Sequence, residues 1–191
     1  PRSCTLLGTE RIAFVTFGSS YATWNFVTQE WDLNGIEPAV SLNAVAVVEN
    51  DIYSIGDAGI LQINGQPSTH AGSLCNFLLP FGDSVLTGGP MGTVFDARTG
   101  EALYQHRSPL NCGTTFERNG QLHAAIGTYT GEALIFCLEA GKPRFVTAVS
   151  LHENAIKGIA ADEGFLFSVC ATAAAAFHRI SDFGLERYLD K

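Results

Sequence analysis

A residue pair that recurs five times constrains this chain more than any other sequence feature. In each unit a large apolar residue is followed by a polar or sulfur-containing residue at the end of a β-type run. The pairs are Trp24-Asn25, Ile63-Asn64, Phe95-Asp96, Phe136-Cys137 and Phe177-His178. They are 39, 32, 41 and 41 residues apart. A period of this length is typical of a repeat architecture, in which each unit is one supersecondary motif.

Each unit contains four short strand-like runs separated by turn signals. The first two runs flank turns that favour hairpins: Glu49-Asn50-Asp51, Phe81-Gly82-Asp83, Arg118-Asn119-Gly120 and Asp162-Glu163-Gly164. The third run ends at the recurring pair, and a turn rich in Asp or Gly leads into the fourth. The Ala-rich run 171–176 is interpreted as a tightly packed strand rather than a helix. Four short strands every 40 residues or so are typical of a β-propeller blade.

The predicted fold is therefore all-β, a β-propeller of about five four-stranded blades in a single domain over residues 1–191. The blades are expected at approximately 1–38, 39–72, 73–109, 110–151 and 152–191. A closed five-bladed ring and part of a larger propeller both remain open. The expected strand Leu185–Tyr188 would show whether the ring closes against the first blade.

The repeats resemble those of the WD-repeat superfamily, in which the third strand of a blade ends in Trp-Asp. Phe95-Asp96 and Trp24-Asn25 are the nearest matches, and the run from His152 to Ile156 is similar to the His and apolar opening of such a repeat. Asp96–Leu103 is equally similar to quinoprotein-like propeller repeats. The literal Trp31-Asp32 falls in an expected fourth strand and is not a match.

This resemblance carries expectations for structure and function. His70, His106 and His152 take the place of the structural His that hydrogen-bonds within a blade. The resemblance also implies a scaffold that binds protein partners, on the face that carries the loops joining one blade to the next and the second strand to the third.

Composition and charge exclude several other classes. The chain has 11 Lys and Arg against 19 Asp and Glu, which argues against a nucleic-acid partner because phosphate binding needs clustered cations. No apolar run approaches 18 residues, so no membrane contact is expected. Five cysteines without a C-x-x-C pair favour reduced thiols and a cytoplasmic location. Phosphate- and nucleotide-binding motifs are missing, so no cofactor is expected.

The candidate catalytic residues are Asp57, His152 and Glu153. Asp57 lies in a loop between a second and a third strand, and Glu37 and Glu153 each precede the first strand of a unit. Glycoside hydrolysis needs two carboxyl groups about 5–10 Å apart. The sequence does not show that any of these carboxylates approach one another, and solvated loop charges are the simpler interpretation.

The candidate binding residues are Tyr21, Asp57, Tyr129 and His152. Tyr21 and Tyr129 occupy equivalent loops of two units, and an exposed tyrosine on a rigid face is typical of an interface, although a buried loop anchor would give the same pattern. Three cysteines are expected at equivalent positions at the start of first strands, where thiolates could bind copper(I) or zinc: Cys4, Cys75 and Cys112. A buried packing role for these thiols is the alternative.

The leading functional hypothesis is a non-catalytic β-propeller that binds protein partners. The first alternative is a hydrolase or lyase with its active site at the channel mouth, around Asp57, His152 and Glu153. The second is a small-ligand or sugar-binding propeller that uses Trp24, Tyr21 and Tyr129 as stacking platforms.

Overall fold

The computed structural model describes residues 2–16, 18, 20–33 and 41–185. Within these residues 19 strands form five antiparallel sheets, each built from strands that are consecutive in the chain. The first sheet contains β1 (Ser3–Leu7), β2 (Arg11–Val15), β3 (Tyr21–Asn25) and β4 (Glu30–Leu33). The second contains β5 (Leu42–Val48), β6 (Asp51–Gly56), β7 (Ile60–Ile63) and β8 (Gln66–His70).

The remaining three sheets follow the same plan. The third contains β9 (Phe77–Phe81), β10 (Ser84–Gly88), β11 (Thr93–Asp96) and β12 (Ala102–Gln105). The fourth contains β13 (Leu110–Arg118), β14 (Gln121–Thr128), β15 (Glu132–Glu139) and β16 (Lys142–Ser150). The fifth contains β17 (Ile156–Asp162), β18 (Phe165–Cys170) and β19 (Ala175–Arg179), followed by the short 3-10 helix η1 (Ile180–Phe183).

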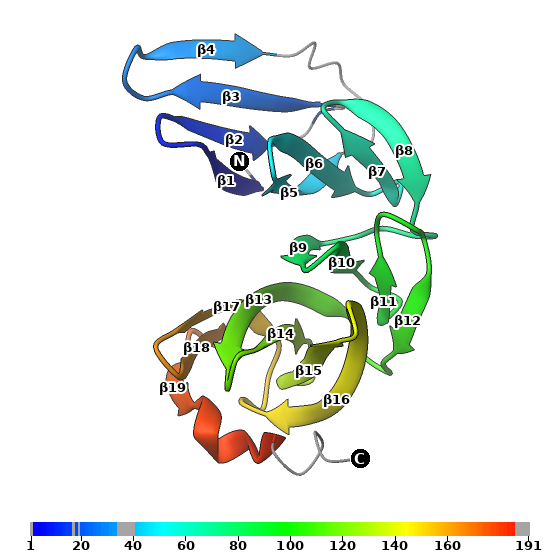
Figure 1. The fold of residues 1–191 in the computed structure, drawn as a ribbon, viewed down its shortest axis with the longest axis vertical. Helices are drawn as coiled ribbons and strands as arrows, with labels where there is room; N and C mark the ends of the chain where they lie inside the picture. The colour runs from blue at the N-terminus through cyan, green and yellow to red at the C-terminus, as the bar shows by residue number, and fades with distance from the viewer. Residues whose placement is uncertain (1, 17, 19, 34–40, 186–191) are drawn as a thin grey trace.

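The five sheets are the blades of a β-propeller, which confirms the predicted fold class. Figure 1 shows them following one another around a curve, with the first and fifth sheets at its two ends. The first strand of each sheet contacts the first strand of the next, so β1, β5, β9, β13 and β17 form the inner side of the curve. In the described part of the chain, no helix has the length and apolar character needed to cross a bilayer.

Tight two-residue turns close several of the hairpins. Asn119 and Gly120, between β13 and β14, have φ of 53° and 72°. Ala140 and Gly141, between β15 and β16, have φ of 49° and 78°. Positive φ at both central residues is the geometry whose twist matches that of the flanking strands. The predicted hairpin turns are therefore confirmed, and the sequence signal came from Asn-Gly and related pairs.

The core consists of four apolar clusters, one between each pair of successive sheets. The fourth sheet shows how a single strand serves two of them. Ala124 and Ile126 of β14 pack toward the third sheet, whereas Ala125 between them packs toward the fifth. Because side chains alternate across a strand, a sheet covered on both faces needs a continuous apolar run. The low charge content of the chain follows from this stacking.

The Ala-rich run 171–176 differs from its prediction. Residues 171–174 form a turn in which Ala173 has a φ of 61°, and β19 begins only at Ala175. Residues 171–175 are exposed, so the expectation of a tightly packed strand is wrong. The reason is position. Residues 171–174 are the loop between β18 and β19, and β19 belongs to an end sheet that packs against another described sheet on one face only.

The expected fourth strand of the last unit lies mostly outside the described residues. Leu185 follows η1 and is fully buried against the fourth sheet. Residues 186–188, like Glu37, lie outside the part of the chain that the structure describes.

Candidate binding site at the channel mouth

A repeated backbone clamp positions the loops between second and third strands. The carbonyl of the last loop glycine accepts a hydrogen bond from the chain that arrives from the fourth strand of the same sheet. The donor and acceptor pairs are Ala71 N to Gly59 O at 2.8 Å, His106 N to Gly92 O at 2.8 Å and Leu151 N to Gly131 O at 2.9 Å. Each loop is thereby tied to the segment that leads to the next sheet.

The glycines of this clamp are required by their surroundings. Gly131 has a φ of 83°, a region that side chains other than glycine rarely adopt. A Cβ atom at this position would lie 1.9 Å from the carbonyl oxygen of His152. Gly59 and Gly92 also have positive φ, 64° and 74°, and a Cβ at either would lie 2.2 or 2.3 Å from a backbone carbonyl oxygen. The close approach keeps the loops short and rigid.

Asp57 and Tyr129 occupy equivalent positions in two of these loops. The backbone N–H of Asp57 donates to the carbonyl of Ser41 at 2.9 Å, and that of Tyr129 donates to the carbonyl of Pro109 at 2.9 Å. The backbone is therefore held by the same kind of hydrogen bond at both residues. Asp57 belongs to the second sheet and Tyr129 to the fourth.

Asp57 is held by two polar neighbours. Asn43 Nδ2 donates a hydrogen bond to Asp57 Oδ1 at 2.8 Å, and Arg2 Nη1 lies 3.8 Å from the same oxygen. Arg2 also donates to the Asn43 side-chain oxygen. The carboxylate is about one third exposed, at 38% of its side-chain surface, so it faces solvent while it is fixed by an amide and a guanidinium.

A ladder of asparagines crosses the junctions between sheets, and the sequence analysis missed it. Each amide donates to a backbone carbonyl of the next sheet. The bonds are Asn43 Nδ2 to Cys75 O at 3.1 Å, Asn76 Nδ2 to Leu110 O at 2.9 Å and Asn111 Nδ2 to Ile156 O at 3.1 Å. The available signal was the recurrence of Asn directly after the first apolar residue of an inner strand.

A β-bulge explains why the side chains of Asn43 and Asn111 point across the junction, whereas Asn76 lies directly before β9. The pairing of β5 with β6 shifts between Leu42 and Ala44, and that of β13 with β14 shifts between Leu110 and Cys112. The residue skipped in each case is the asparagine. A bulge leaves one residue out of the ladder and re-aims its side chain. In the fifth sheet the residue at the equivalent bulge is Lys157.

Tyr129 and Lys157 meet across the junction between the fourth and fifth sheets. The Lys157 ammonium lies 4.0 Å from the centroid of the Tyr129 ring, which is a cation–π distance. Tyr129 is 41% exposed and Lys157 is exposed. Arg2, Asn43, Asn76 and Asn111 line a hollow at the starts of the inner strands. Asp57 is linked to it through Asn43, Lys157 through Asn111, and Tyr129 through Lys157. We call these seven residues the rim.

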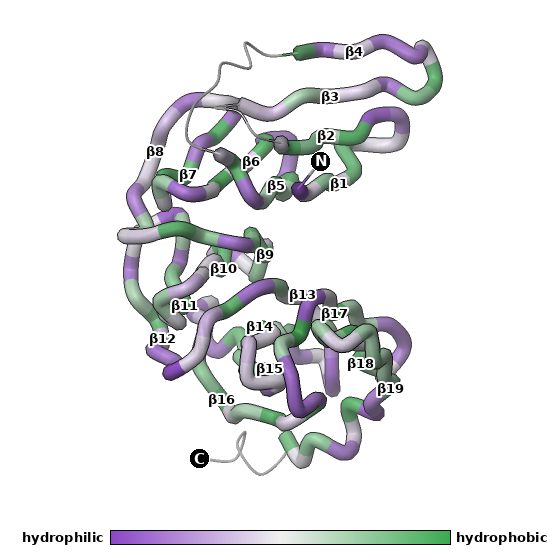
Figure 2. Tube along the Cα trace, turned by 180° about the vertical axis from the view of Figure 1, so that it is seen from behind, coloured by the Kyte–Doolittle hydropathy of each residue, from purple (hydrophilic) through white to green (hydrophobic). Residues whose placement is uncertain are grey.

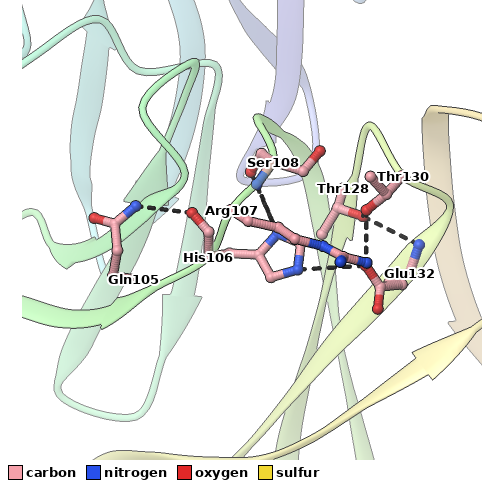
Figure 3. A network of polar contacts seen from close by, with 7 residues as sticks. All are labelled: Gln105, His106, Arg107, Ser108, Thr128, Thr130 and Glu132. Carbon is pink, nitrogen blue, oxygen red and sulfur yellow. Dashed lines mark hydrogen bonds and ion pairs between the residues drawn. The ribbon is translucent and has the colours of Figure 1, made fainter.

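A polar network ties the Tyr129 loop to the third sheet (Figure 3). Glu132 Oε2 accepts a hydrogen bond from Thr130 Oγ1 at 2.7 Å and lies 3.4 Å from His106 Nε2. The backbone N–H of Ser108 donates to His106 Nδ1 at 3.2 Å, which holds the ring with Nε2 facing the carboxylate. Arg107 Nη2 lies 3.7 Å from the same carboxylate oxygen.

The charge state of Glu132 follows from these contacts. The Thr130 hydroxyl lowers the pKa of the Glu132 carboxyl, and His106 and Arg107 lower it further. Glu132 therefore stays ionised at neutral pH and can pair with the Arg107 guanidinium.

His152 forms a second network, at the start of the fifth unit. Its Nε2 lies 2.8 Å from Ser168 Oγ, and Ser168 Oγ lies 3.2 Å from His178 Nε2. Burial and the neighbouring His152 ring lower the pKa of His178. Glu153 is exposed. Among the described residues no hydrogen bond or ion pair joins Asp57 to either of the other two catalytic candidates.

The other candidate histidines and aromatic residues lie apart. His106 contacts Glu132 of the next unit as well as Ser108 of its own, and His70 is exposed at the end of β8. Tyr21 packs against the cluster between the first and second sheets, where burial and Asp32 raise the pKa of its hydroxyl. Trp24 instead stacks on Trp31 of β4. The structure therefore does not gather Tyr21, Trp24 and Tyr129 at one place.

The three candidate metal-binding cysteines also lie apart. Cys4 is exposed on β1, and Cys75 is buried in the cluster between the second and third sheets. Cys112 follows the ladder asparagine of its strand whereas Cys75 precedes one, so the two positions are not equivalent. Burial raises the pKa of Cys75, and it raises that of Cys112 to about 12. The described residues hold no group of three His, Cys, Asp or Glu side chains suited to a metal ion.

Comparison with known proteins shows the fold alone. No protein-family model matches the chain, and no curated protein matches it. The computationally designed Ika8 protein superposes with a TM-score of 0.68 and 16% identity over 93% of this chain, which spans 57% of that chain. The computationally designed Ika4 protein gives a TM-score of 0.60 and 17% identity, covering 78% of this chain and 96% of its own. The propeller arrangement is shown; membership of the WD-repeat or quinoprotein families is not.

Proposed function

We propose that this chain is a non-catalytic β-propeller that binds a protein partner through the rim. The observation that carries the proposal is an exposed pair, Tyr129 and Lys157. Tyr129 lies on a loop whose backbone is clamped at Gly131 and braced by Glu132, and Lys157 lies beside it at the bulge of β17. Side chains that are ordered before binding lose little conformational entropy on association. Tyrosine is also among the residues that contribute most to protein–protein binding.

The catalytic candidates have structural partners instead. Asp57 is engaged by Asn43 and Arg2, and His152 by Ser168 and His178. The bond from His152 to Ser168 stays within the fifth unit, which supports the proposed likeness to WD-type repeats. The cytoplasmic location is likewise a proposal, supported by five free cysteines.

The rim can be tested by comparing what three forms of the chain capture from a cell extract. The first is the wild type, and the second carries Tyr129→Ala and Lys157→Ala. The third carries Lys142→Ala, which removes an exposed lysine beside the β15–β16 turn, at the opposite end of the fourth sheet. Quantitative mass spectrometry is expected to find at least one protein whose recovery falls tenfold or more with the double variant and is unchanged with Lys142→Ala.

Two results would count against this function. Equal recovery of every captured protein by all three forms would place binding elsewhere on the molecule. A chemical turnover that Asp57→Asn abolishes, in a chain that captures no protein, would favour the hydrolase or lyase alternative.

A further inference from the structure

The outward face of the first sheet is an apolar surface over which none of the described sheets packs. The register pairs Leu6 with Ile12, Ile12 with Trp24, and Trp24 with Trp31, so these residues share one face. Phe14 and Leu33 belong to the neighbouring row of the same face, because both align with Ala22. We call these six residues, Leu6, Ile12, Phe14, Trp24, Trp31 and Leu33, the leading face. No charged side chain stands in these two rows.

The leading face is exposed, whereas the opposite face of the same sheet is buried where it packs against the second sheet. Leu6, Trp31 and Leu33 are 65%, 58% and 62% exposed, whereas Ala13 and Val15 on the opposite face are fully buried against the second sheet. Trp24 and Trp31 stack with centroids 5.9 Å apart, which makes one continuous aromatic surface. Figure 2 shows the run of hydrophobic residues along β2 in this sheet.

The fifth sheet also exposes apolar residues on its outward face, where the charged Asp162 and Arg179 flank Phe165. Ala160 pairs with Phe167, and Phe167 pairs with Phe177, so they form one row, with Phe165 and Val169 on the same side. We call these five residues the trailing face. Phe177 is 75% exposed and lines a shallow hollow of about 370 Å³ together with Phe165 and Phe167. On the inward face, Leu166 is fully buried.

The leading and trailing faces correspond to the two kinds of sheet face that pack together at the four junctions between successive sheets. At every internal junction the face of one sheet that points toward higher residue numbers packs against the face of the next that points toward lower ones. The trailing face is of the first kind and the leading face of the second. Large uncovered apolar patches of this sort mark interaction surfaces.

We propose that the trailing face of one molecule packs against the leading face of a second copy of this chain, as successive sheets pack within the molecule. The argument is continuity with the four internal junctions: the same sequence supplies both complementary surfaces. The contact is head-to-tail, so one molecule of a pair keeps its leading face free and the other keeps its trailing face free. It does not involve the rim, and it stands or fails independently of the proposed function.

The head-to-tail arrangement gives a test that ordinary dimerisation would fail. One variant, Leu6→Glu with Leu33→Glu, disables the leading face, and another, Phe165→Glu with Phe177→Glu, disables the trailing face. All four side chains are exposed, so the substitutions leave the cores in place. Gln66→Glu on the outer strand β8 is the control, and circular dichroism checks that every form is folded.

The molar mass of each form is measured by light scattering and sedimentation between 1 and 200 μM, a range chosen for about micromolar to millimolar affinities. The wild type and Gln66→Glu are expected to show a mass that rises with concentration beyond the dimer. Each face variant alone is expected to be monomeric, and an equimolar mixture of the two is expected to form dimers and nothing larger. In each such dimer the intact trailing face of one variant packs against the intact leading face of the other.

Three outcomes would overturn the proposal. If the wild type is monomeric at all concentrations, the two faces do not bind a second copy of this chain. Association that survives both pairs of substitutions would place the contact elsewhere. A mixture of folded variants that remains monomeric would exclude the head-to-tail arrangement.

Discussion

At the scale of single residues, the most demanding positions are the glycines that tie the loops of the channel mouth. Gly131 combines a positive φ with a carbonyl oxygen 1.9 Å from where a Cβ would be, and Gly141 has the same backbone conformation with open space around it. The pair separates the cost of backbone strain from the cost of a steric clash.

We expect Gly131→Ala to lower the free energy of unfolding by about 3 kcal/mol, because strain and overpacking add. Gly141→Ala is expected to cost only about 1 kcal/mol, since it carries the strain alone. Urea-induced unfolding of both variants would measure the difference. Equal losses for the two would show that the approach to His152 O is not a constraint.

Glu132 gives a prediction for pH. The pKa of this carboxyl in the folded chain lies below its ordinary value of 4.5, so its contribution to stability is present above that value and is lost as the pH falls through the folded pKa. We expect Glu132→Gln to reduce the free energy of unfolding by about 1 kcal/mol at pH 7. The gap between variant and wild type should narrow as the pH falls below 4.5. Thermal unfolding between pH 3 and 7 would show this.

Glu101→Gln provides the control for this series, because Glu101 is exposed in the turn before β12 and lies outside the network. The control should follow the wild type across the whole range. A constant gap for Glu132→Gln at every pH would mean that the charge of the carboxylate is not what stabilises the junction.

At the scale of strands and sheets, the asparagine ladder adds hydrogen bonds between successive sheets, which otherwise contact each other through the apolar clusters. Asn76 Nδ2 donates to Leu110 O across the junction between the third and fourth sheets. Replacing it leaves a partly buried carbonyl without this donor. We expect Asn76→Ala to cost about 1 kcal/mol of unfolding free energy, and Asn50→Ala, in an exposed turn, to cost little. Chemical denaturation is the measurement, and equal effects would contradict the ladder.

The strands themselves could be predicted from the sequence, because apolar runs and turn pairs such as Asn119-Gly120 are local signals. The direction of side chains at the channel mouth could not. The bulges at Asn43, Asn111 and Lys157 shift the alternation by one residue, and this shift depends on the neighbouring strand. That is why Cys75 and Cys112 looked equivalent in the sequence and are not, and why the asparagines were missed.

At the scale of the whole molecule, the propeller could be predicted from the period of the recurring pairs, since the period survives when individual residues change. The meeting of Asp57 with Arg2 and of Tyr129 with Lys157 could not, because each pair joins two sheets. The Ala-rich run shows the same limit: its packing depends on whether another sheet covers it. The local sequence pattern predicts the strands of each blade. Whether a residue of the first or fifth blade is buried depends instead on whether another sheet packs against it.

The clamp also divides the molecule into two sides with different tolerance to change in chain length. On the side of the channel mouth, Gly59, Gly92 and Gly131 bind the arriving chain directly, so an inserted residue would break a backbone bond that orients Asp57 or Tyr129. On the opposite side, Gly120 and Gly141 have open space around them. Peptide tags, reporter loops or new recognition segments can therefore be grafted at those hairpin tips while the rim keeps its geometry.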